Sequence, residues 1–148
     1  MNLSRINGGV FLGLRSFIHR LTAPRLTSGF IDSPVKLVLV INNDLKMGKG
    51  KIAAQAGHAS VSATMKAGEK SPSILDSWLK SGQKKVCLKT NFDDLIDLEN
   101  KAKSTGIQTV RINDAGKTQI PSGSLTVIAF GPDDEEKLEQ LTGHLKLL

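Results

Sequence analysis

The sequence predicts an α/β protein: a single three-layer domain in which a mixed four-stranded β-sheet carries α-helices on both faces. Residues Leu37 to Ile41 form an unbroken apolar run, which is typical of a strand buried on both sides. Strand and helix patterns then alternate in the order strand, helix, helix, strand, helix, strand, strand, helix. The link of residues 113–123 is too short for a parallel crossover, so the last two strands are expected to be antiparallel if they are neighbours.

The first half of the domain contains one expected strand and two expected helices. The apolar run places the first strand at Lys36–Ile41. A helix over about Lys51–Ala67 follows, because its many small residues suit close packing on a sheet. Ser71 and Pro72 have the residue types of an N-cap and a first helical position, and they open a short helix that ends at Lys80.

The second half follows the same logic of apolar periodicity and helix capping. Asn91 has the residue type of an N-cap, two acids follow it, and lysines and then a glycine mark the end of that helix. The expected elements are a strand over Val86–Lys89, a helix over Phe92–Ser104, strands over Gln108–Ile112 and Ser124–Phe130, and a final helix over Asp133–Leu141.

The chain divides into an amino-terminal extension, residues 1–34, and a domain, residues 35–148. The 148 residues are enough for one domain with a real core, and half of the formal net charge of +6 comes from the extension. Residues 1–31 contain spaced arginines and no acid, which is typical of an organellar transit peptide and predicts mitochondrial localisation. The alternative is a disordered extension of a cytoplasmic protein. The apolar stretch is too short to span a membrane.

The turn between the first strand and helix has the features of an anion-binding site. It contains Gly48 and Gly50, which let backbone N–H groups approach a ligand, and three lysines beside a helix N-terminus. The turn lacks the glycine and hydroxyl positions of a Walker loop. Gly48, Gly50 and Ala53 do match G-x-G-x-x-A, which would predict NAD binding, but a helix is inserted and the second strand ends in Thr90 and Asn91 instead of an acid. A plain glycine turn with solvated lysines remains the alternative.

A second polar segment, Asp114 to Gly123, follows the third strand. Asp114 lies where loops of open sheets collect functional residues, and Thr118 and Gln119 add a hydroxyl and an amide. Asp114 could orient or deprotonate water for hydrolysis while Lys51 neutralises an oxyanion. The alternative is an ordinary polar hairpin loop, and the sequence alone does not bring these groups together.

One face of the first helix begins at the glycine and lysine turn and continues through His58. Lys51, Gln55 and His58 share this face by helical spacing. His58 is most simply explained as a hydrogen-bonded scaffold residue. Two histidines and one cysteine in the domain argue against a metal site, and no cofactor is expected.

Four separated motifs together resemble the type 2 peptidyl-tRNA hydrolases of archaea and eukaryotes. They are LVLVINNDLKMGKGKIAAQAGHA, GQKKVCLK, DAGKTQI and TGHLKLL, and the resemblance covers the chain from about Lys36 to Leu148. The resemblance implies a mixed four-stranded sheet flanked by helices. It also implies hydrolysis of the ester that joins a peptide to the terminal ribose of tRNA.

The family's catalytic positions correspond to four residues of this chain, Lys51, Gln55, Asp114 and Thr118. The resemblance implies that Asp114 and Thr118 position or activate water, while Lys51 and Gln55 bind the RNA 3′ end or the developing oxyanion. The expected substrate-binding residues are Lys46, Lys49, Asp44, His58, Lys117 and Gln119, of which the three lysines would attract phosphates. The chain departs from the family pattern at Asn42 and Lys117, where an arginine is more common, and both changes could lower RNA affinity.

The expected partner is peptidyl-tRNA, and the sequence leaves a homodimer and protein partners open. Animal members of the family are also linked to cell-death signalling. The alternative function is therefore a non-catalytic RNA-binding or signalling protein on the same fold. Failure to release peptide from peptidyl-tRNA would favour that alternative, and saturable NAD binding would favour a dinucleotide site.

Overall fold

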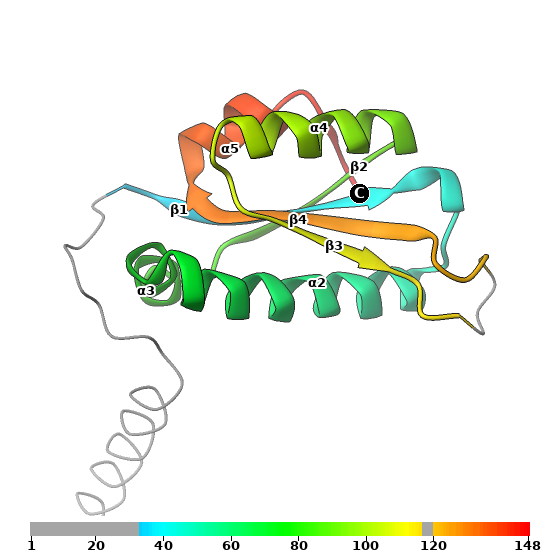
Figure 1. Ribbon diagram of the computed structural model, residues 1–148, viewed down its shortest axis with the longest axis horizontal. Coiled ribbons are helices and arrows are strands. Elements are labelled where there is room, and N and C mark those ends of the chain that lie inside the picture. The colour runs from blue at the N-terminus through cyan, green and yellow to red at the C-terminus, as the bar shows by residue number, and fades with distance from the viewer. Residues whose placement is uncertain (1–32, 117–119) are drawn as a thin grey trace, which may run out of the picture.

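The computed structural model describes residues 33–116 and 120–148, which form a mixed β-sheet between two layers of helices (Figure 1). The sheet has the strand order β3-β4-β1-β2-β5. β1 and β2 are parallel, and the other neighbouring pairs are antiparallel. The expected α/β class is confirmed, and so is the antiparallel pairing of β3 with β4. The strands are β1 Val35–Asn42, β2 Lys85–Thr90, β3 Thr109–Asn113, β4 Leu125–Asp134 and β5 Lys146–Leu147.

The prediction of four strands is wrong by one. β5 lies in the carboxyl-terminal tail and pairs antiparallel with β2, where Leu147 lies opposite Leu88. Its two residues are too few to show the alternation of polar and apolar side chains that marks a strand in a sequence. Only the sheet edge offered by β2 gives this segment its strand geometry.

The helices cover both faces of the sheet, as expected. α2 (Lys49–Lys70) and α3 (Pro72–Lys80) lie on one face, and α4 (Phe92–Ser104) and α5 (Glu135–Thr142) lie on the other (Figure 1). A short 3₁₀ helix, η2 (Asn43–Leu45), connects β1 to the glycine and lysine turn.

β1 is the central strand because its side chains serve both cores. Leu37, Leu39 and Ile41 belong to the core under α2 and α3. Val38 and Val40 belong to the core under α4 and α5. All eight residues of β1 are buried, which confirms the interpretation of the apolar run as a strand covered on both faces.

The junction of β4 with α5 differs from the prediction. β4 continues through Asp134 instead of ending at Phe130, because residues 133 and 134 pair with the start of β1. The Asp134 side chain accepts hydrogen bonds from the backbone N–H groups of Glu136 and Lys137, so α5 begins at Glu135 rather than Asp133. The capping of α4 is as expected, since the Asn91 side chain accepts from the Asp94 N–H at 2.9 Å.

Candidate active site

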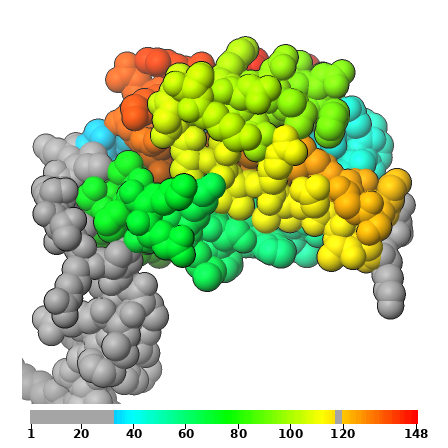
Figure 2. Space-filling model, in the orientation of Figure 1, coloured from blue at the N-terminus to red at the C-terminus, as the bar shows by residue number. Residues whose placement is uncertain are grey.

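The predicted functional residues gather at the sheet edge where β1 and β3 end. β1 and β3 both run antiparallel to β4, so their carboxyl ends lie at the same edge. Asp114 directly follows β3, and Lys51 lies in the first turn of α2. Figure 2 shows the described residues around the β3–β4 loop, in yellow and orange, at one end of the molecule.

The structure joins Lys51 to Asp114, although 63 positions separate them in the chain. The Lys51 ammonium forms an ion pair and hydrogen bond with Asp114 Oδ1. The Asp114 side chain is only 2% exposed, whereas that of Lys51 is 22% exposed. The backbone of Asp114 is also fixed, because its N–H donates to Ser124 O and its carbonyl accepts from Gly123 N–H, both at 2.8 Å. A buried carboxylate is thus paired with a lysine whose side chain is partly exposed to solvent.

Gln55 lies one helical turn beyond Lys51 and contacts a residue that the sequence analysis missed. The Thr126 hydroxyl lies 2.9 Å from Gln55 Oε1 and 2.9 Å from the carbonyl oxygen of Ile112. Thr126 is fully buried in β4. Its single proton can serve one of these acceptors at a time. The available clue in the sequence was a hydroxyl residue within an otherwise apolar strand.

Asn42 and Asp44 form a connection between the end of β1 and its neighbours. Asn42 is buried, and its side-chain amide donates to Leu125 O at 2.9 Å and accepts from the Asp44 N–H at 3.1 Å. Asp44 Oδ2 in turn accepts from the Phe92 N–H at 2.8 Å, at the start of α4. The structure therefore gives both residues local structural contacts; the substrate role predicted for Asp44 stays a prediction.

The other predicted substrate-binding residues on this side are exposed. Lys46, Lys49 and His58 all have exposed side chains, and His58 has no hydrogen-bond partner among the described residues, unlike the scaffold role expected for it. A Cβ atom added at Gly48 or Gly50 would meet no protein atom within 4 Å. The protein itself therefore leaves space above the start of α2.

Some predictions fall outside the described residues. Lys117, Thr118 and Gln119 lie in the β3–β4 loop beyond Gly116, and residues 1–32 hold nearly all of the predicted transit peptide. The roles proposed for these residues stay predictions. In the described part of the chain, no helix combines the length and apolar character needed to cross a membrane.

Cys87 is half-buried in β2, and burial raises the pKa of its thiol. A raised pKa leaves less thiolate at neutral pH, so the side chain is a poor nucleophile. Across residues 33–116 and 120–148, no three His, Cys, Asp or Glu side chains are grouped so that they could hold a metal ion.

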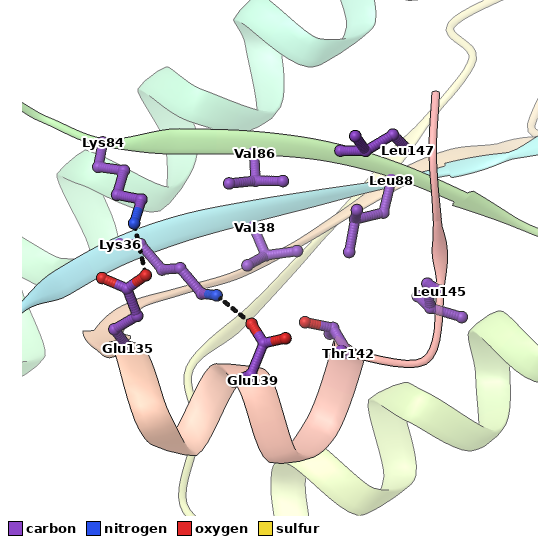
Figure 3. Close-up of a pocket in the computed structure, with 11 residues that line it drawn as sticks. Lys36, Val38, Lys84, Val86, Leu88, Glu135, Glu139, Thr142, Leu145 and Leu147 are labelled. Atoms are coloured by element: carbon purple, nitrogen blue, oxygen red, sulfur yellow. Dashed lines mark hydrogen bonds and ion pairs between the residues drawn. The ribbon is translucent and has the colours of Figure 1, made fainter.

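A separate pocket of about 250 Å³ lies between the sheet and α5 (Figure 3). Lys36 pairs with Glu139 at 2.7 Å, and Lys84 pairs with Glu135, so the charged groups of this pocket neutralise one another. None of the predicted site residues lines it. The pocket therefore lies apart from the Lys51–Asp114 pair.

A family model described as "Peptidyl-tRNA hydrolase PTH2" matches residues 35–148 of this chain. The chain belongs to this family. The peptidyl-tRNA hydrolase of Methanocaldococcus jannaschii is 52% identical over 115 residues, which are 77% of this chain and 100% of that protein. The peptidyl-tRNA hydrolase of Methanothermobacter thermautotrophicus is 44% identical over 115 residues, again 77% of this chain and 100% of that protein.

A mammalian relative shows the same match within a longer protein. The mouse protein "Peptidyl-tRNA hydrolase 2, mitochondrial" is 49% identical over 113 residues, which are 76% of this chain and 62% of the mouse protein. This PTH2 chain is therefore similar to proteins from both archaea and animals. The Lys51–Asp114 pair lies within residues 35–148, which the family model matches.

Proposed function

We propose that this chain hydrolyses the ester bond between peptide and tRNA in peptidyl-tRNA and so releases free tRNA and free peptide. Membership of the PTH2 family supports this function. The observation that carries it is the Lys51–Asp114 pair, which joins a buried acid to a partly exposed lysine at the loop edge of the sheet. Release of labelled peptide from peptidyl-tRNA by the full chain tests it.

The reaction requires water to add to the ester carbonyl carbon. Negative charge then develops on the carbonyl oxygen, and the carbon–oxygen bond to the terminal ribose breaks. The ribose oxygen leaves as a hydroxyl with one proton of the water, the second proton passes to solvent, and the peptide leaves as a carboxylate. The site must therefore orient water and stabilise an oxyanion.

The proposed roles follow from the positions of the charged and polar groups. Asp114 is fixed by its backbone and buried, so it positions or activates the water. The Lys51 side chain is partly exposed and Gln55 lies one turn away, so these two face the developing oxyanion or the RNA 3′ end. Thr118 would share the role of Asp114.

Thr126 positions Gln55 in this proposal, so removing its hydroxyl should impair catalysis without opening a cavity. Thr126→Val keeps the side-chain shape but breaks the contacts with Gln55 and with the Ile112 carbonyl. We expect kcat/KM for peptidyl-tRNA to fall roughly tenfold, which corresponds to one lost hydrogen bond in the transition state. Steady-state kinetics measures this change.

The matched control is Thr142→Val, because Thr142 is equally buried but bonds only to Leu138 O within α5. An equal loss of activity in both variants would show that Thr126 acts through stability and not through Gln55.

The proposed domain is residues 35–148, and we propose that residues 1–34 are an extension that directs the chain to mitochondria. The acid-free, arginine-containing composition of residues 1–31 supports this location, as do mouse and bovine relatives whose names include "mitochondrial". A fluorescent reporter fused to residues 1–34 should enter mitochondria. The same fusion with its four arginines replaced by glutamine should not, and diffuse cytosolic signal from the unaltered fusion would contradict the proposal.

A further inference from the structure

Two lysines on neighbouring strands point to the same face of the sheet. Lys89 of β2 lies directly opposite Lys146 of β5, as Leu88 lies opposite Leu147. Figure 3 shows Leu88 and Leu147 among the residues that line the pocket beside α5. Side chains alternate between the two faces of a strand, so Lys89 and Lys146 point to the other face, the one that carries α2 and α3.

This arrangement places two positive charges next to each other with no neighbouring carboxylate among the described residues to neutralise them. Directly opposite residues in an antiparallel pair have Cβ atoms about 4.5–5.5 Å apart, and like charges there destabilise the sheet. Neither lysine has a carboxylate within ion-pair distance among residues 33–116 and 120–148. Lys89 is half-buried and Lys146 is exposed, so an anion from solution can reach both. A phosphate between them would relieve their repulsion.

The charges of the helices make this face the one that attracts an anionic polymer. α2 and α3 contain five lysines and two acidic residues. α4 and α5, on the opposite face, contain three lysines and seven acidic residues. A nucleic acid is therefore attracted to the α2–α3 face and repelled from the α4–α5 face.

The sheet register connects the lysine pair to the candidate active site. One row of paired residues crosses all five strands, from β3 to β5. In order, its members are Ile112, Val127, Ile41, Lys89 and Lys146. Ile112 lies two residues before Asp114. Four strand spacings of about 4.8 Å separate the ends of the row, which is roughly 19 Å. RNA bound at Lys146 can thus reach Asp114 with a short length of its strand.

We propose that Lys89 and Lys146 form a phosphate clamp that holds the acceptor arm of tRNA on the α2–α3 face while its 3′ end reaches the Lys51–Asp114 pair. The clamp rests on the proposed function, since it assigns a docking surface to the same substrate. It adds two contacts to the backbone of the RNA, independent of base sequence. It takes no part in bond breaking.

The test compares uncharged tRNA binding by the full chain with binding by Lys89→Gln and Lys146→Gln across a salt series. Each variant should bind roughly fivefold more weakly at low salt, and the slope of log K against log salt should become shallower by about one. The matched control is Lys101→Gln, because Lys101 is exposed on α4 and should change neither quantity. Lys101→Gln should also keep the wild-type kcat and KM for peptidyl-tRNA, whereas Lys89→Gln and Lys146→Gln should raise KM.

A charge reversal separates binding from folding. Lys89→Glu places opposite charges across β2 and β5, so its thermal midpoint should equal or exceed that of the wild type while tRNA binding weakens further than in Lys89→Gln. Wild-type affinity and salt slope in the lysine variants would overturn the clamp, and so would a lowered midpoint in Lys89→Gln. A wild-type chain that binds tRNA through the clamp but cleaves no peptidyl-tRNA would instead contradict the proposed function.

Discussion

Asp114→Asn should lower the kcat for peptidyl-tRNA hydrolysis about 10³-fold, the range expected when a positioned carboxylate that orients or deprotonates water is lost. The replacement has nearly the same shape, so it fits the buried position after β3, where the acid is 4% exposed. Its amide removes the negative charge that Lys51 and the attacking water meet. Peptide release at saturating substrate measures the effect, and KM should change little because the proposed contacts to tRNA phosphates come from other residues.

Asp97→Asn is the control for this substitution. Asp97 is an exposed acid on α4, on the opposite face of the sheet from α2. It should keep wild-type kcat. If Asp114→Asn kept the wild-type kcat, the Asp114 carboxylate would have no part in catalysis.

Lys51→Met should have two effects of comparable importance. It removes the cation that we propose to face the developing oxyanion, and the loss of one such group lowers kcat by about 10²–10³-fold. It also removes an ion pair to the buried Asp114 carboxylate, which costs roughly 2–4 kcal/mol of folding stability. Kinetics and chemical denaturation of the same preparation separate these two losses.

The control is Lys66→Met, also on α2, whose ammonium donates to the carbonyl of Thr109 and not to an acid. It should leave kcat unchanged and lower stability by only about 1 kcal/mol. A Lys51→Met variant as stable as the wild type would show that the Lys51–Asp114 ion pair does not contribute to folding stability.

The sequence predicted the parts of the fold that local patterns determine. β1 was predictable because its apolar run is continuous, and the bounds of α4 were predictable because Asn91, the early acids and the late lysines mark both ends. β5 and the extended end of β4 were not predictable. Each depends on a neighbouring strand far away in the chain, so no local pattern of two or three residues indicates it.

The candidate site shows the same division. Lys51 and Asp114 were proposed from the chemistry of their own segments and Gln55 from its place on one helix face, and the family resemblance then marked all three as catalytic positions. Thr126 was missed because its role depends on the approach of Gln55 from α2, 71 positions away in the chain. The contact of Asp44 with the start of α4 likewise joins segments that no periodicity relates.

The most direct test of the Lys51–Asp114 centre is single-turnover cleavage of peptidyl-tRNA by the wild type and by the double variant Lys51→Met/Asp114→Asn. Removing both charges deletes the ion pair as a whole, so the double variant should be more stable than Lys51→Met and should still bind tRNA. The account predicts that the wild type releases peptide and that the double variant, saturated with substrate, releases it at the uncatalysed rate. Cleavage by the double variant at the wild-type rate would contradict it.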